Sequence, residues 1–211
     1  MILYRYMKCE PFEYVLDVIL NERLYCASVE EFNDPMEGLV QFNPYDYIAE
    51  NSAPLDREIS AMKQLALHRE YIKEYRVCSL SKRNDDILLW SHYCGGHAGL
   101  CIECDVPSTA TGLHEVIYVA NPRDHEKAAR YMPMHYLTHK LKVWENEQEV
   151  RIIQREAYYN IQGRIRRLIL GSRLPQTYFD TIEKTAKERF ALAVAYIHSD
   201  TGRMMIHDLA L

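Results

Sequence analysis

The sequence predicts a single α+β domain whose strands form a mixed, mostly antiparallel sheet. Its 211 residues are 48% apolar and 26% charged, which are average values for a globular protein. A chain of this length buries about 70% of its surface in one core. Short alternating stretches follow one another closely, without the regular strand–helix alternation of a parallel doubly wound sheet. We expect one domain over residues 1–211 with a helical insertion at about 43–75.

The amino-terminal part of the chain predicts two strands, each followed by a helix. Residues 2–6 read as a strand, and Pro11 opens a stretch whose apolar residues recur at helical spacing. Residues 24–27 form a second short strand. Ser28, with Glu31 three residues later, is the capping-box pattern that begins a brief helix.

The middle of the chain predicts helices on either side of a third strand. The insertion is polar and tyrosine-rich, and its apolar residues at helical spacing are Ile59, Met62, Leu65, Ala66 and Ile72. Residues 77–81 alternate as a strand does. Asp85 and Asp86 begin a helix that runs to Tyr93 and ends at the glycines Gly95 and Gly96.

The remainder of the chain predicts mainly strands. We expect them near residues 100–104, 116–119, 149–154, 165–170, 193–198 and 203–207. Helices are expected near 124–140 and at 176–190. The sequence contains no internal repeat, linker or low-complexity tract.

Charge, hydropathy and cysteine content exclude several classes of protein. The 25 basic and 30 acidic residues give a net charge of −5 without a block of like charge, so nucleic-acid binding is not indicated. The longest uncharged apolar stretch, residues 190–197, is far shorter than the roughly 20 residues of a membrane-spanning helix. The start of the chain has no signal-peptide pattern, and the 6 scattered cysteines suit buried free thiols. We therefore expect a cytoplasmic protein without a membrane partner.

The densest polar cluster in the sequence lies at residues 144–151. Side chains alternate along a strand, so Glu149 and Arg151 share one face, and Glu147 joins them if the strand begins early. Two carboxylates this close repel, which raises the pKa of one unless a cation such as Arg151 compensates. This arrangement suits acid–base chemistry, and it also fits an exposed strand edge with a surface ion pair.

Arg5 is a single cation between two tyrosines on an otherwise apolar strand. A buried guanidinium needs an anion, which is either the Glu147 and Glu149 pair or the phosphate of a ligand. On another predicted strand, Ser79 and Ser81 share one face, where they can bond to neighbouring backbone or to a ligand.

Other chemistries find little support in the sequence. Cys101 and Cys104 resemble zinc ligands in spacing, but they fall in a predicted strand and point to opposite faces. His92 and Asp85 are available to a Ser or Cys nucleophile, yet no nucleophile elbow is present. The sequence also lacks a Walker loop and a dinucleotide-binding glycine motif.

Short motifs follow one another in a characteristic order over nearly the whole chain. They are LYRY at 3–6, LYCAS at 24–28, FNDPME at 32–37, CSLS at 78–81, LWSHY at 89–93, GLCIE at 99–103, VIY at 116–118 and LILG at 168–171, with Trp144, Glu147, Glu149 and Arg151. Together they resemble the bacterial family catalogued as domain of unknown function 2971. Related-looking proteins include components of phage resistance and of toxin–antitoxin systems. The resemblance implies a fold more than an activity.

A more distant resemblance is to the ADP-ribosyltransferase superfamily. Its signature is an Arg on the first strand, a Ser-x-Ser strand and a Glu-x-Glu, and Arg5, Ser79 with Ser81, and Glu147 with Glu149 stand in that order. The resemblance implies an ADP-ribosyltransferase-like fold and an enzyme that transfers a glycosyl group from NAD. NAD is then the substrate, a nucleotide-type small molecule, and no metal is expected.

The transferase resemblance also implies roles for the residues that would bind NAD. Arg5 would hold the phosphates or the ribose, and Ser79 or Ser81 would shape the nicotinamide pocket. Tyr6 or Tyr93 would stack on nicotinamide.

The two glutamates would carry the chemistry in the same interpretation. Glu149 would bind the ribose 2′-hydroxyl and stabilise an oxocarbenium-like transition state. Glu147 would orient or deprotonate the acceptor.

Two other functions fit the same residues. In one, the cluster of Arg5 and Glu149 is a buried ion-pair network in a non-enzymatic protein of a defence or toxin–antitoxin system. The 16 tyrosines favour this function, because surface aromatics are typical of interfaces with a partner protein or with a second copy. The other is a metal-dependent nuclease with the carboxylates Asp34, Glu37, Glu147 and Glu149.

Overall fold

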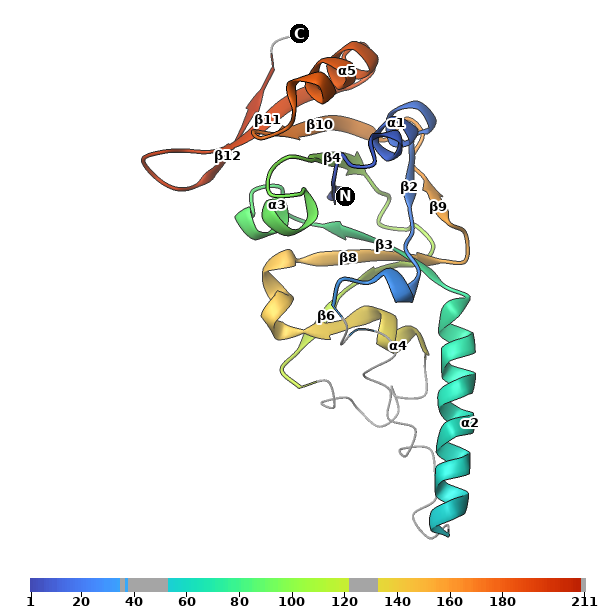
Figure 1. Ribbon diagram of the computed structural model, residues 1–211. Helices are drawn as coiled ribbons and strands as arrows, with labels where there is room; N and C mark the ends of the chain where they lie inside the picture. The colour runs from blue at the N-terminus through green and yellow to red at the C-terminus, as the bar shows by residue number, and fades with distance from the viewer. Residues whose placement is uncertain (35–36, 38–52, 122–132, 210–211) are drawn as a thin grey trace.

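The computed structural model describes residues 1–34, 37, 53–121 and 133–209, and most of its strands form one eight-stranded sheet (Figure 1). These strands are β1 (Ile2–Met7), β3 (Arg76–Ser81), β4 (Leu100–Asp105), β5 (Leu113–Glu115), β8 (Glu149–Gln154), β10 (Ile165–Gly171), β11 (Ala191–Ile197) and β12 (Met204–Asp208). Their order is β12-β11-β10-β4-β1-β3-β8-β5, in which β10 and β11 are parallel and the other neighbours antiparallel. The predicted mixed, mostly antiparallel α+β fold is confirmed.

Two small sheets and several helices complete the described structure. The small sheets pair β2 (Arg23–Tyr25) with β9 (Tyr158–Asn160), and β6 (Ile117–Val119) with β7 (His139–Leu141). The helices are α1 (Phe12–Asn21), α2 (Pro54–Lys73), α3 (Ile87–Tyr93), α4 (Pro133–Thr138) and α5 (Gln176–Ala186), with the 3-10 helices η1 (Val29–Glu31) and η4 (Lys142–Glu147). Across the described ranges, no helix combines the length and the apolar character needed to span a bilayer.

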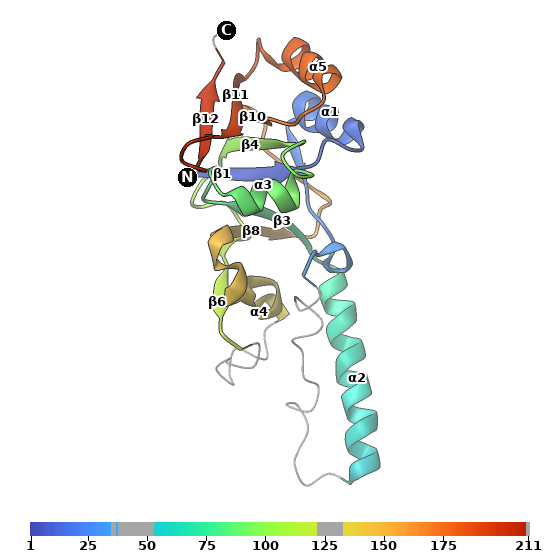
Figure 2. The ribbon, with the colours of Figure 1, turned by 60° about the vertical axis from the view of Figure 1, so that its left-hand side comes forward.

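Helices pack on both faces of the large sheet because its strands alternate apolar residues between the two faces. On one face, Val15 of α1 and Ile182 of α5 belong to the core cluster that also contains Leu3 and Leu80. On the other face, Trp90 of α3 packs in a separate cluster with Tyr6, Cys101 and Ile169. Figure 2 shows α1 and α5 together on one side of the strands.

Helix α2 runs away from the sheet in both ribbon views (Figures 1 and 2). Ile72 and the half-buried Leu65 belong to a third cluster, which also contains Leu137 of α4. Ile59 and Met62, which lie at helical spacing with them in the sequence, are exposed. The part of the predicted insertion at 43–52 lies outside the described residues.

The helix caps and the glycine stop lie where the sequence predicted them. The Ser28 N–H donates to the Glu31 carboxylate at 2.6 Å, as the capping box requires. Asp86 caps α3 by accepting bonds from two N–H groups of the first turn. Gly95 and Gly96 follow the helix at φ of 58° and 69°, a region that favours glycine.

Several boundaries differ from the prediction. Residues 139–141 form β7, whereas a helix was expected near 124–140; of that range, 124–132 lies outside the described residues. β5 and β9 were missed because three residues are too few to show alternation. The last predicted helix ends at Ala186, before the expected residue 190.

All six cysteines are buried free thiols, as predicted. Cys101 lies in the cluster under α3, and Cys104 lies in the cluster under α1 and α5. The two side chains therefore point to opposite faces of β4, and they cannot ligate one zinc ion together.

Candidate functional site

The strands that carry most of the predicted site residues are neighbours, because β3 lies between β1 and β8. Ser81 of β3 is opposite both Tyr4 of β1 and Glu149 of β8, and Ser79 is opposite Arg151. Residues directly opposite each other in a ladder share a face of the sheet. Both serines, Glu149 and Arg151 therefore lie on one face, as the alternation predicts.

Arg5 lies on the opposite face of the sheet. Its partner in the ladder with β4 is Ile102, which belongs to the core under α1 and α5. The Arg5 guanidinium donates to the backbone carbonyl of Ser79 at 2.7 Å. Of the two expected anions, this placement rules out the Glu147 and Glu149 pair. Tyr4 shares the face of Glu149, and Arg5, the next residue along the strand, points to the other face.

Tyr6 points to the same face as Glu149, but its ring packs in the core. The Tyr6 and Trp90 rings meet edge to face with centroids 5.4 Å apart. The Tyr6 hydroxyl donates to the backbone carbonyl of Arg83 at 2.9 Å. Burial raises the pKa of this phenol, so it stays protonated. These contacts give Tyr6 a structural role, unlike the expected stacking on a ligand.

Glu147 reaches Glu149 through a turn and not along a strand. It is the last residue of η4, and β8 begins at Glu149. Between them, Gln148 adopts φ 44° and ψ 51°, a left-handed conformation that costs energy for a residue with a Cβ. The expected early start of the strand is therefore replaced by a strained turn, and the two carboxylates meet at a shared lysine.

That lysine, Lys140 of β7, binds three carboxylates at once. Its Nζ lies 3.2 Å from Glu37 Oε1, 2.7 Å from Glu147 Oε2 and 3.1 Å from Glu149 Oε2. Lys140 is only 4% exposed. The ammonium thus occupies the point where these carboxylates would have to hold a metal ion. In the part of the chain that the structure describes, no group of three or more His, Cys, Asp or Glu side chains is arranged to bind a metal.

Arg151 is the second buried cation, with 1% of its surface exposed. Its Nε donates to Glu149 Oε1 at 2.8 Å and its Nη2 to Glu149 Oε2 at 3.0 Å, a two-pronged bond that suits the planar guanidinium. Nη2 also donates to Glu37, and Nη1 donates to the backbone carbonyl of Leu137 at 2.8 Å. We call Glu37, Lys140, Glu147, Glu149 and Arg151 the charge cluster.

Hydroxyl groups complete the hydrogen bonding of the charge cluster. Tyr93 donates to Glu147 Oε1 at 2.8 Å, and Ser81 donates to the Glu147 backbone carbonyl at 2.6 Å. A hydrogen bond from Ser79 also reaches the Glu149 carboxylate. Five of the seven predicted site residues therefore lie in one network, and Arg5 and Tyr6 do not.

The two central carboxylates have pKa values shifted in opposite directions. Burial by itself raises the pKa of Glu149, but Arg151 and Lys140 overcome that effect and hold it at about 2. Burial also raises the pKa of Glu147, and here Lys140 and the Tyr93 bond do not fully offset it. Glu149 is therefore ionised at neutral pH, whereas Glu147 takes up a proton more readily.

The cations and the phenol around these carboxylates keep their protons. Burial disfavours the charged forms of Lys140 and Arg151, yet their carboxylate neighbours raise the pKa of both above the ordinary values. Burial raises the pKa of Tyr93. All three groups are hydrogen-bond donors at neutral pH.

Aromatic side chains connect the charge cluster with the surface. The Trp144 ring centroid lies 5.2 Å from Lys140 Nζ, and the His92 ring meets Trp144 at 6.2 Å. His92 is exposed and Trp144 is half-buried. Trp144 therefore contacts both the buried Lys140 and the exposed His92.

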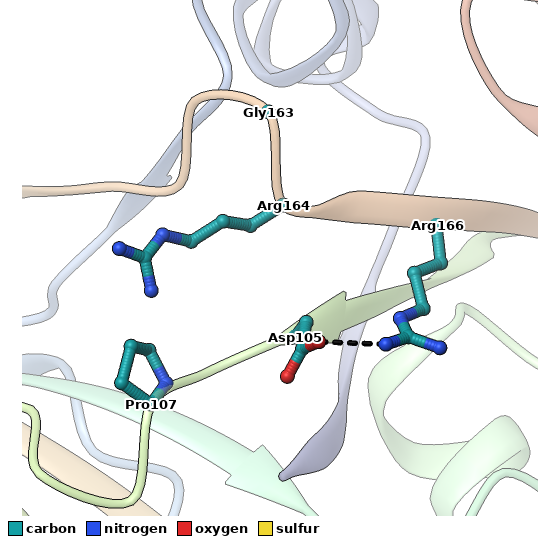
Figure 3. Close-up of a pocket in the computed structure, with 5 residues that line it drawn as sticks. All are labelled: Asp105, Pro107, Gly163, Arg164 and Arg166. Carbon is teal, nitrogen blue, oxygen red and sulfur yellow. Dashed lines mark hydrogen bonds and ion pairs between the residues drawn. The ribbon is translucent and has the colours of Figure 1, made fainter.

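A separate pocket of about 360 Å³ lies where β4 ends and β10 begins (Figure 3). It is lined by Asp105, Pro107, Gly163, Arg164 and Arg166. Arg166 binds Asp105 at 2.6 Å, and the Arg164 side chain points away from this pair. The pocket contains none of the predicted site residues.

Three residues of the hydrogen-bonded network around Glu149 were not predicted from the sequence to belong to it. Lys140 falls in a segment expected to be helical, and its sequence neighbours, His139 and Leu141, form no recognised motif with it. Glu37 was considered only as a metal ligand. Tyr118, whose hydroxyl accepts a 2.8 Å bond from the Glu149 N–H, lies on a strand with no polar pattern.

Comparisons of the chain with models of protein families, with curated proteins and with solved structures find no match. The chemistry of the charge cluster is therefore the basis on which a function can be assigned.

Proposed function

We propose that the protein is a cytoplasmic enzyme that breaks the N-glycosidic bond of a nicotinamide nucleotide such as NAD. The supporting observation is the pair Glu147 and Glu149, whose pKa values are shifted in opposite directions within one hydrogen-bonded network. Such a separation assigns different acid–base roles to two neighbouring carboxylates. The 6 buried free thiols support a cytoplasmic location, because cysteines stay reduced in that compartment.

Each carboxylate has a role in this reaction. When nicotinamide leaves with the electrons of its bond to ribose C1′, positive charge develops on the ribose, and the ionised Glu149 stabilises that charge. The acceptor then forms a bond to C1′ and gives its proton to Glu147. Tyr93 holds the Glu147 carboxylate in place through its 2.8 Å bond. The resemblance to ADP-ribosyltransferases supports the same roles.

The placement of Arg5 changes one part of this interpretation. Because Arg5 lies on the far face, the phosphates of the nucleotide require a different cation. Lys82 and Arg83 directly follow Ser81 and are partly exposed, which makes them the candidates for that role. We expect Arg5→Lys to leave the KM for NAD unchanged.

The first test measures nicotinamide release from NAD by the purified protein and by Glu149→Gln. A matched control is Glu103→Gln, because Glu103 is opposite Tyr4 on the same face and forms an ion pair with Arg167 at 2.6 Å. We expect Glu149→Gln to lower turnover about 100-fold or more, since it removes the charge that stabilises the transition state. The control should keep turnover close to that of the wild type.

Thermal unfolding of both variants shows whether they fold. Absence of nicotinamide release by the wild type at millimolar NAD contradicts the proposal, as does equal turnover in the wild type and a folded Glu149→Gln variant.

A second candidate function is partner binding in phage defence or in a toxin–antitoxin system. The observation that favours it is that both oxygens of Glu149 already accept bonds from Arg151 or Lys140, as in a structural ion-pair network. Glu149→Gln should destabilise the fold by about 3 kcal/mol or more whichever function holds, because Arg151 loses its main anion. Turnover separates the two functions: a wild type that releases no nicotinamide favours partner binding, and turnover lost in a folded Glu149→Gln variant favours the enzyme.

A further inference from the structure

Helix α2 carries two apolar stripes on different sides. The stripe toward the rest of the protein contains Ala61, Leu65, His68 and Ile72, which are buried or half-buried. The second stripe contains Leu55, Ile59, Met62 and Ala66, which are exposed. With about 100° between successive residues, the second stripe lies within about 60° of arc and points some 120° away from the first.

The exposed stripe has the spacing of a coiled-coil seam. Leu55, Ile59 and Met62 are 68%, 44% and 72% exposed. Steps of four, three and four residues place them and Ala66 at successive d and a positions of a heptad. Isolated apolar residues on a surface need no partner, but a continuous seam of this spacing fits one helix of a partner.

We infer that this seam binds the α2 seam of a second copy of the chain in an antiparallel orientation. Figures 1 and 2 show α2 projecting from the sheet, and its carboxyl-terminal part packs toward α4. An antiparallel pair places the two sheets at opposite ends of the helix pair. A parallel pair would place them side by side at one end.

Charges beside the seam favour the same arrangement. When Ile59 packs against Met62 of the partner copy, the rise of about 1.5 Å per residue places Asp56 roughly 3 Å along the axis from Lys63 of the partner copy. Asp56 and Lys63 both occupy the e position, and e positions face each other in an antiparallel pair. The two-fold symmetry forms this opposite-charge pair twice.

The seam covers less than two heptads, so the buried area is smaller than in a standard interface. We therefore expect a reversible dimer whose population rises with protein concentration. The inference does not depend on the proposed enzymatic activity, because none of the seam residues belongs to the charge cluster.

The test is sedimentation velocity of the full chain from about 5 to 500 µM, a range that detects weak dimers. We expect a concentration-dependent dimer for the wild type and a shift to monomer for Met62→Glu. The matched control is Leu67→Glu, which adds the same charge at a 65% exposed apolar residue of α2 outside the seam. The control should dimerise as the wild type does.

A charge exchange tests the orientation. Lys63→Glu should weaken the dimer about tenfold, because it faces Asp56 of the partner copy, and Asp56→Lys combined with Lys63→Glu should restore it. A wild type that stays monomeric, a dimer unaffected by Met62→Glu, or a double variant no stronger than Lys63→Glu overturns the inference. Nicotinamide release by Met62→Glu, measured in parallel, reports on the enzymatic proposal separately.

Discussion

Lys140 is the cation that three buried carboxylates share. Glu37, Glu147 and Glu149 are each 5–6% exposed, and each would lose much of its hydration on folding. The Lys140 ammonium touches all three, and Arg151 binds two of them. Burial raises the pKa of Glu147, which Lys140 binds, whereas Arg151 binds Glu37 and Glu149.

Lys140→Met should destabilise the protein by about 3–5 kcal/mol at neutral pH, since it leaves buried carboxylates without a cation. Urea unfolding measures this loss. The matched control is Lys82→Met, which removes an exposed 2.7 Å pair with Glu115 and should cost less than about 1 kcal/mol.

The difference between these two variants should narrow as the pH falls, because Glu147, whose pKa is already raised, takes up a proton and then needs no cation. Equal destabilisation by both variants at neutral pH would show that the ammonium does not stabilise the buried carboxylates.

Among the elements, α3 connects the sheet with the charge cluster. It begins at Asp86, whose Oδ1 accepts bonds from the N–H groups of Leu88 and Leu89 at 2.8 and 3.1 Å. It ends at Tyr93, whose hydroxyl reaches Glu147. The cap at one end of this short helix therefore helps to position a site residue at the other end.

Asp86→Ala should destabilise the protein by about 1 kcal/mol, because both N–H groups lose their acceptor. Asp85→Ala is the control, since the exposed Asp85 binds Arg83 and, among the described residues, caps no helix. Thermal unfolding of the two variants measures the difference. An Asp85→Ala variant that is as unstable as Asp86→Ala would assign the effect to lost surface charge.

The alternation of side chains along a strand predicted some of the contacts between elements and not others. Alternation predicted that Glu149 and Arg151 share a face, and the ladder to Ser79 and Ser81 confirms this. The same alternation separates Arg5 from Tyr4 and Tyr6, but it does not say which face meets Glu149; the pairing with β3 and β4 decides that.

The left-handed turn at Gln148 could not be predicted, because glutamine has no preference for that conformation. Lys140 was missed for a related reason. It approaches Glu147 and Glu149 from a different small sheet, and no sequence spacing encodes that contact.

In the whole molecule, strand order depends on contacts between distant segments. β1 pairs with β3 and β4, and the parallel pair of β10 and β11 is joined through α5. Composition and short strands predicted a mostly antiparallel sheet. They could not predict the order, because pairing is selected by packing on both faces and not by any one strand.

The acid stability of the whole protein should fall in two stages. Burial lowers the pKa of His68 to about 4, below its unfolded value near 6.5. The neutral ring therefore contributes to the free energy of unfolding above about pH 6.5, and this contribution is lost as the pH falls toward 4. That contribution is at most about 3 kcal/mol. Glu149, with a pKa of about 2, loses its contribution between about pH 4 and 2. The raised pKa of Glu147 has the opposite effect on stability: the folded protein binds this proton more tightly than the unfolded chain, so the group adds stability as the pH falls.

Urea unfolding between about pH 7.5 and 4.5 measures the first stage, and His68→Asn should flatten it. A wild-type stability that stays constant over this range would contradict the assignment to His68. An equally steep fall in His68→Asn would do the same.

The charge cluster carries its own counter-ions. Pairs on the surface, such as Arg155 with Glu74 at 2.9 Å, compete with dissolved salt, and screening weakens them as ionic strength rises. Lys140 and Arg151 are covalently tethered and shielded from solvent, so the ions of the medium reach them far less. The geometry around Glu147 and Glu149 should therefore persist across saline conditions that loosen the periphery of the molecule.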